Sequence, residues 1–115
     1  MFRLSERLPP AVAMEILLTG DPITAERAFA YGMINVLVEP EDTLTVAMAL
    51  ARRISVNAPL AVQETRAVAA AARYEDEDGL WRLSGDALKR ISTTEDFREG
   101  PRAFVEKRPP VWQGR

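Results

Sequence analysis

The chain has 115 residues, a formal net charge of -2 at pH 7, and neither cysteine nor histidine. A chain of this length forms one domain at most. Because both residue types are absent, the sequence excludes disulfides, thiolate nucleophiles, histidine general bases and the usual zinc sites. Hydrophobic residues make up 47% of the chain and charged residues 28%, so a mostly structured protein is expected.

Charge and hydropathy argue against two further classes of protein. General affinity for nucleic acid relies on clustered cations, which the slightly negative charge does not favour. No apolar run approaches the ~20 residues that span a bilayer. The start, residues 1–7, lacks the long apolar core of a secretory signal. We therefore expect a cytoplasmic protein.

Two short helices are predicted in the first third of the chain. Residues 11–18 are helix formers, and Gly20 supplies a left-handed stop behind them. Thr24 is expected to cap a second helix, which Gly32 ends. The run Ile-Asn-Val-Leu-Val at residues 34–38 indicates a short extended segment, too short to make a sheet alone.

Three longer helices follow. From Glu41 an apolar stripe recurs at helical spacing, and Pro59 then favours the start of an alanine-rich helix over residues 60–73. Residues 74–79 are acidic and resemble a linker, and a further stripe follows them, with Trp81 beside it. The first stripe consists of Leu44, Ala47, Met48, Ala51 and Ile54, and the second of Leu80, Leu83, Ala87, Leu88 and Ile91.

A last helix is predicted near the carboxyl end. Residues 92–94 interrupt the preceding helix, and Gly100-Pro101 is expected to open the next one, because proline loses no hydrogen bond in a first helical turn. Pro109-Pro110 must stop it. The chain is therefore predicted to be mainly α.

No self-sufficient active site can be assembled from these residues. The run Glu75 to Asp78 is far more typical of a solvated loop than of a metal or acid–base site. The hydroxyl groups lack a histidine to activate them. Gly79 and Gly85 are isolated and follow no strand, so phosphate-binding loops have no support.

Phe104 and Lys107 are three residues apart and are expected to share one helical face. An aromatic surface beside an ammonium group suits a phosphorylated ligand that carries adenine. The alternative is that Phe104 packs in the core and that Lys107 is a solvated cation at the end of a helix, favoured by the helix dipole. Composition alone favours this alternative.

Three segments carry a resemblance to a known family, and the helices between them extend it over nearly the whole chain. They are residues 13–38, with Ala-Met-Glu-Ile-Leu-Leu-Thr-Gly-Asp-Pro, residues 58–66, with Ala-Pro-Leu-Ala-Val-Gln-Glu-Thr-Arg, and residues 94–110, with Gly-Pro-Arg-Ala-Phe-Val-Glu-Lys-Arg-Pro-Pro. In this order and spacing they resemble the carboxyl end of the crotonase superfamily, the enoyl-CoA hydratases and isomerases.

The resemblance implies the helical carboxyl-terminal region of a crotonase-like fold, without its β/α spiral core. Residues 1–115 would form a single helical region, with residues 1–40 at the end of the core and residues 41–115 as the part that builds a trimer or a dimer of trimers. Phe104 would pack beside the adenine or pantetheine arm of a CoA bound by a neighbouring subunit, and Lys107 would attract its phosphates.

The same resemblance implies a substrate and leaves out the catalytic groups. The complete enzyme would act on an acyl-CoA thioester without a further cofactor, most simply as an enoyl-CoA hydratase, with double-bond migration or other enolate chemistry as alternatives. The family's oxyanion hole and catalytic carboxylates lie in the preceding spiral core. No catalytic or metal-binding residue is therefore expected here, and the chain is interpreted as a carboxyl-terminal part of such an enzyme.

Two other hypotheses belong to different classes. The chain could be a non-catalytic helical module that self-associates or binds a partner, and about 150 further residues before Met1 would decide for an enzyme instead. A small helical nucleic-acid binder is disfavoured by the net charge. Under either of the first two hypotheses, the two apolar stripes predict self-association.

Overall fold

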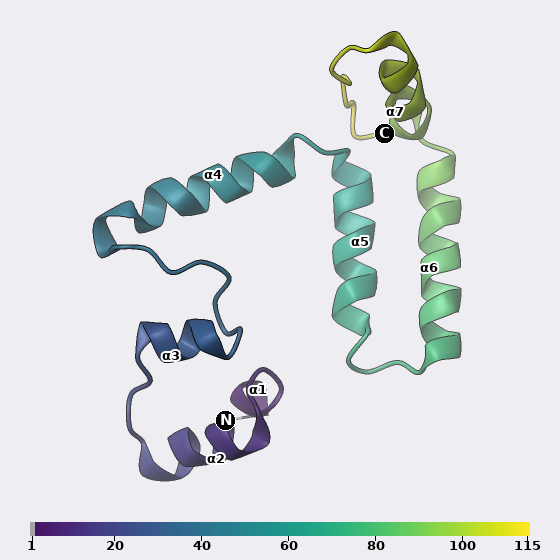
Figure 1. Ribbon diagram of the computed structural model, residues 1–115. Helices are drawn as coiled ribbons and strands as arrows, with labels where there is room; N and C mark the ends of the chain where they lie inside the picture. The colour runs from purple at the N-terminus through teal and green to yellow at the C-terminus, as the bar shows by residue number, and fades with distance from the viewer. Residues whose placement is uncertain (1) are drawn as a thin grey trace. The chain divides into compact units, whose positions relative to one another are not determined.

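The computed structural model describes residues 2–115, and in this range it contains helices and irregular segments but no strand. The predicted mainly α class is therefore confirmed. The elements in chain order are α1 (Phe2–Ser5), α2 (Pro10–Thr19), α3 (Ala25–Ala30), the short 3-10 helix η1 (Pro40–Asp42), α4 (Thr43–Ser55), α5 (Pro59–Ala71), α6 (Glu77–Ser92) and α7 (Glu95–Glu106) (Figure 1).

The chain divides into two compact units, Met1–Val46 and Ala47–Arg115. The first unit has a small core in which Leu8, Val12 and Ala13 are buried. Leu4, Ile16 and Met33 are partly buried and pack against these three side chains. Apolar residues from α1, from α2 and from the loop after α3 thus hold this unit together.

The predicted ends of α2 and α3 are confirmed. Gly20 follows α2 with φ 75°, a left-handed conformation that glycine adopts without the penalty of a side chain. The hydroxyl of Thr24 accepts a hydrogen bond from the amide of Arg27 at 3.2 Å and so caps α3. Arg27 also donates to both carboxylate oxygens of Glu15, at 2.9 and 2.7 Å, which ties α3 to α2.

Two features of the first unit differ from the prediction. Helix α1 was not predicted, because a four-residue helix leaves too short a pattern to recognise. The expected extended segment at residues 34–38 forms no strand, since residues 33–35 bend and residues 36–39 have no regular secondary structure. A strand needs a neighbour to satisfy its backbone groups, and the described residues provide none.

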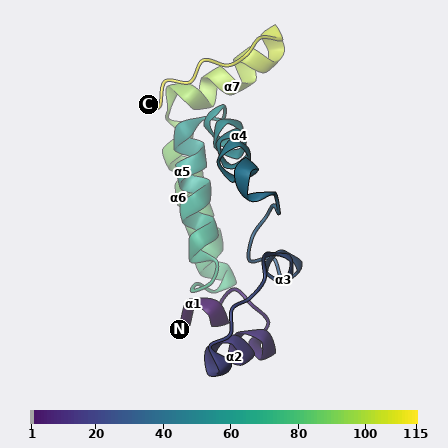
Figure 2. The same ribbon diagram turned by 90° about the vertical axis from the view of Figure 1, so that its left-hand side faces the viewer.

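The second unit is built on an antiparallel pair, α5 and α6, which lie side by side in both views (Figures 1 and 2). The alanine-rich sequence of α5 permits this close approach, as expected. Arg90 on α6 donates to both carboxylate oxygens of Glu64 on α5, at 2.8 and 2.7 Å. Hydrogen bonding to Arg90 lowers the pKa of Glu64.

The interior of the second unit is thin. No residue of α4 or α5 is buried, and α6 buries only Gly79 and Ala87. Large apolar side chains stay exposed instead, including Met48 and Ile54 on α4 and Leu88 on α6. The apolar stripes that sequence periodicity identified are therefore present, but little of the described chain covers them.

Two helix starts were predicted wrongly. Helix α6 begins inside the acidic stretch, because the Asp76 carboxylate accepts a hydrogen bond from the Gly79 amide at 2.8 Å and caps it. Helix α7 begins at Glu95 and not at Gly100-Pro101, because the Thr94 hydroxyl accepts from the Phe97 amide at 3.2 Å. Pro101 consequently lies inside α7, where its missing N–H leaves one helical hydrogen bond unmade.

Candidate functional site

The carboxyl end of α7 carries both residues singled out in the sequence, Phe104 and Lys107. The helix ends at Glu106, so Lys107 lies one residue beyond it and not on its face as predicted. Lys107 has φ 53° and ψ 38°, the left-handed conformation usually taken by glycine at this position. Its amide donates to the carbonyl of Phe104 at 3.3 Å, and the Arg108 amide donates to that of Ala103 at 3.1 Å.

These two bonds form a Schellman motif, which satisfies carbonyls at the end of the helix. The motif leaves two apolar side chains in the last turn facing solvent, with Phe104 85% exposed and Val105 79% exposed. Lys107 is exposed as well, and it forms no ion pair within the part of the chain that the structure describes. The end of α7 therefore presents an aromatic surface and a free ammonium group.

After Lys107 the chain turns back along α7, and we call residues 108–115 the carboxyl-terminal strap (Figure 2). The Asp96 side chain, which is only 4% exposed, holds the far end of the strap. Its two carboxylate oxygens accept from the amides of Gln113, at 2.6 Å, and Gly114, at 3.0 Å. A buried carboxylate is thus satisfied by two backbone donors.

Glu99 holds the near end of the strap. The Arg108 guanidinium donates to both of its carboxylate oxygens, at 2.5 and 2.9 Å, and the Val111 amide donates to one of them at 2.8 Å. The hydrogen bonds from Arg108, followed by that from Val111, lower the pKa of Glu99 from 4.5 to about 2. Arg108 also donates to Glu106 at 2.6 Å, so its charge lies between two carboxylates.

Trp112 fixes the middle of the strap. Its indole N–H donates to the carbonyl of Val56, just after α4, at 2.7 Å. Its ring covers Gly100 of α7, where an added Cβ would lie 3.5 Å from the ring. The strap therefore connects α7 to the segment between α4 and α5.

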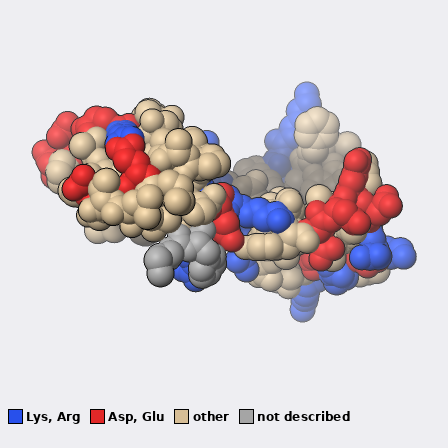
Figure 3. Space-filling view, turned by 90° about the horizontal axis from the view of Figure 1, so that it is seen from below, with Lys and Arg blue, Asp and Glu red and all other residues tan. Residues whose placement is uncertain are grey.

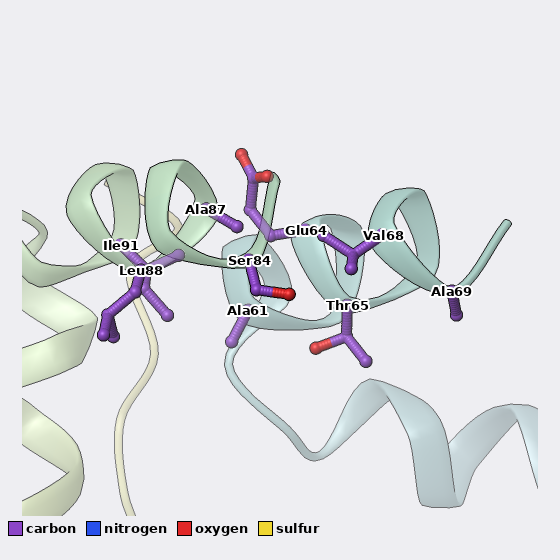
Figure 4. A pocket seen from close by; sticks show the side chains of 9 residues that line it. All are labelled: Ala61, Glu64, Thr65, Val68, Ala69, Ser84, Ala87, Leu88 and Ile91. Atoms are coloured by element: carbon purple, nitrogen blue, oxygen red, sulfur yellow. The ribbon is translucent and has the colours of Figure 1, made fainter. Parts of the chain in front are cut away.

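Two grooves flank α5 within the second unit. The α5–α6 groove has a volume of about 380 Å³ and is lined mostly by short side chains (Figure 4). The α4–α5 groove has a volume of about 660 Å³ and an apolar lining that includes Leu50, Ile54 and Val62, with Arg53 and Arg66 among its other residues. Ala61, Thr65 and Ala69 of α5 line both grooves. Such surfaces suit packing against apolar partners better than bond-breaking chemistry.

The charged groups of the described residues do not assemble a metal site or one large basic patch. No group of three or more acidic, histidine or cysteine side chains could hold a metal ion among residues 2–115. On the face shown in Figure 3, acidic and basic side chains are interspersed between wide uncharged areas. Within the same residues, no helix is both long and apolar enough to cross a membrane.

Sequence reasoning found the exposed pair Phe104 and Lys107 but missed the network that surrounds it. Asp96 and Glu99 are three residues apart on α7, so their common face could have been recognised. Their partners could not, since backbone amides of the strap carry no sequence signal. The two grooves also escaped, because they depend on how α4, α5 and α6 are arranged.

Comparison with known proteins finds a family that matches the whole chain. A family model described as enoyl-CoA hydratase/isomerase matches residues 1–115. Among curated relatives, the carnitinyl-CoA dehydratases of Citrobacter koseri and Proteus mirabilis are 37% and 38% identical to the chain. Each match covers 100% of this chain and 46% of the relative, so the chain spans about half the length of these relatives, in their carboxyl-terminal part.

Solved structures give the same result. Enoyl-CoA hydratase EchA1 from Mycobacterium marinum is 47% identical, with a TM-score of 0.93 over 99% of this chain and 45% of the other. An enoyl-CoA hydratase from Bacillus anthracis is 28% identical, with a TM-score of 0.92 over 98% of this chain and 44% of the other. The helical architecture described above is thus present inside chains about twice as long.

Proposed function

Because the chain belongs to the enoyl-CoA hydratase/isomerase family, we propose that it acts as the carboxyl-terminal part of an enzyme that adds water to, or removes it from, an acyl-CoA thioester. The match over residues 1–115 carries this proposal. The relatives' names, hydratase and dehydratase, describe the two directions of such a lyase reaction. Double-bond isomerisation is the alternative chemistry in the same family.

In this proposal the chain supplies binding and assembly and no catalytic group. The oxyanion hole and the catalytic carboxylates are expected in the preceding spiral core, which agrees with a match to about 45% of each relative. Residues 1–40 would complete that core, and residues 41–115 would build a trimer or a dimer of trimers. The exposed stripes on α4 and α6 support the assembly role, because they leave apolar surface for a partner to cover.

Phe104 and Lys107 are the proposed contacts to CoA. The exposed ring of Phe104 is free to stack against the adenine or pantetheine arm, and the unpaired ammonium of Lys107 is free to meet a phosphate. An acyl-CoA thioester is the proposed substrate, without a further cofactor, and the cytoplasm is the proposed location. The comparisons give no support to a non-catalytic module as the alternative.

A chimaeric enzyme tests the proposal. This chain would replace the matching 45% of the Mycobacterium marinum hydratase, and hydration of crotonyl-CoA would be followed spectrophotometrically. We expect hydratase activity from the chimaera and none from the chain alone. Activity of the chain alone would show that a catalytic site has been overlooked.

The role of Lys107 is tested in the same chimaera. Lys107→Ala should raise KM for crotonyl-CoA about fivefold, since one exposed phosphate contact contributes on the order of 1 kcal/mol. The matched control is Lys89→Ala, which removes the other of the chain's two lysines. An unchanged KM in the Lys107 variant would refute the assignment.

A further inference from the structure

Lys107 has a backbone conformation that its residue type disfavours. A side chain at φ 53° brings Cβ close to the following carbonyl oxygen, which is why glycine is usual at this position of a Schellman motif. Such a conformation persists only where the surrounding structure holds it. The cause must therefore lie in the contacts on either side of Lys107.

Those contacts are made by the strap. Arg108, the next residue, is held between Glu99 and Glu106 by hydrogen bonds to both carboxylates. Further along, the Asp96 carboxylate binds the amides of Gln113 and Gly114. Since α7 before Lys107 and the strap after it are both anchored, the reversal of the chain has to occur at Lys107.

We propose that Asp96 and Glu99 are positioning residues for the exposed end of α7. By latching the strap against the helix they hold Lys107 in its left-handed conformation, and they thereby fix where its ammonium group lies relative to Phe104. This inference rests on the proposed contact of Phe104 and Lys107 with CoA. It adds two carboxylates that touch no ligand but act on it through the backbone.

The latch is tested by NMR on the whole 115-residue chain, with Glu99→Gln and Asp96→Asn. Each variant keeps the size of the side chain but removes its charge and an acceptor oxygen. Exchange of the Trp112 indole proton should become about tenfold faster, because opening of the strap needs less free energy. The HN–Hα coupling of Lys107, which reports φ, should move away from its left-handed value.

Glu95→Gln is the matched control. It makes the same chemical change on the same helix, but its side chain pairs only with Arg98 on the surface, at 3.3 Å. This variant should retain wild-type exchange and coupling. If Glu99→Gln keeps its helix content by circular dichroism and behaves like the control, the inference is wrong. Because the Glu99 side chain is partly exposed, that variant decides the matter even if Asp96→Asn fails to fold.

A rescue experiment separates positioning from general stability. Lys107→Gly should restore slow Trp112 exchange to the Glu99→Gln variant, because glycine adopts the left-handed conformation without strain. Lys107→Ala should not, although it also removes the ammonium group. Equal rescue by both substitutions, or rescue by neither, would argue that Glu99 does not act through the backbone of Lys107.

The chimaeric enzyme distinguishes failure of the latch from failure of the proposed function. Glu99→Gln should raise KM for crotonyl-CoA severalfold with kcat retained, and Glu95→Gln should leave both unchanged. If Lys107→Ala raises KM but Glu99→Gln does not, the positioning role is refuted and the CoA contact stands. If Lys107→Ala also leaves KM unchanged, the CoA contact fails, and the NMR result alone decides whether the latch holds Lys107.

Discussion

Arg108 and Glu99 form a bidentate ion pair beside the end of α7, with Nη1 2.5 Å from Oε1 and Nη2 2.9 Å from Oε2. Two parallel bonds of this kind restrict the orientation of both side chains more than a single contact does. The pair joins the first residue of the strap to a residue nine positions earlier in the chain. It therefore closes the turn at Lys107 from outside.

The strap should loosen in acid. The pKa of Glu99 is lowered to about 2 by Arg108 and the Val111 amide, so the folded chain favours the ionised carboxylate. This contribution to stability is complete above pH 4.5 and is lost as the pH falls from 4.5 towards 2. Thermal unfolding followed by circular dichroism between pH 7 and pH 2 measures the loss. Glu99→Gln should show a shallower decline than Glu95→Gln, and equal declines would contradict the assignment.

Lys107→Gly should stabilise the isolated chain by up to about 1 kcal/mol, because it removes the strain of a side chain at φ 53°. Chemical denaturation measures this change in the free energy of unfolding. In the chimaera the same substitution should raise KM for crotonyl-CoA, since the ammonium group is lost. A more stable chain with weaker substrate binding would show that Lys107 is retained for contact and not for folding.

Gly85→Ala should stabilise the chain by about 1 kcal/mol, because glycine is a poor helix former in the interior of α6. A Cβ at this position would meet nothing within 4 Å. Gly32→Ala is the contrasting change: space is free there too, but φ is +70°, so a loss of about 1 kcal/mol is expected. Thermal denaturation of both variants distinguishes the effect of conformation from that of space.

The isolated chain should self-associate at micromolar concentration through its exposed apolar stripes. Leu44→Ser and Leu88→Ser together should shift the population towards monomer in light scattering. Leu18→Ser is the control, because Leu18 is exposed but belongs to neither stripe. A strictly monomeric wild-type chain would contradict this prediction.

Local sequence signals predicted most of the helices correctly, because each depends on residues close in the chain. Gly20 and Thr24 act on neighbours within a few positions, and the periodicity of α4 and α6 is visible without any partner. The errors have the same origin. Thr94 and Asp76 compete with other capping candidates nearby, and only the folded chain shows which side chain accepts the amide.

The sequence by itself determined the helical class, the amphipathic stripes and the neighbourhood of Phe104 and Lys107. Only the tertiary structure decided that Lys107 takes a left-handed conformation and that a buried Asp96 and a paired Glu99 latch the strap. The physical reason is range. Helix formation and capping involve groups within one or two turns, whereas the strap joins Asp96 to an amide 17 residues away and Trp112 to a carbonyl 56 residues away.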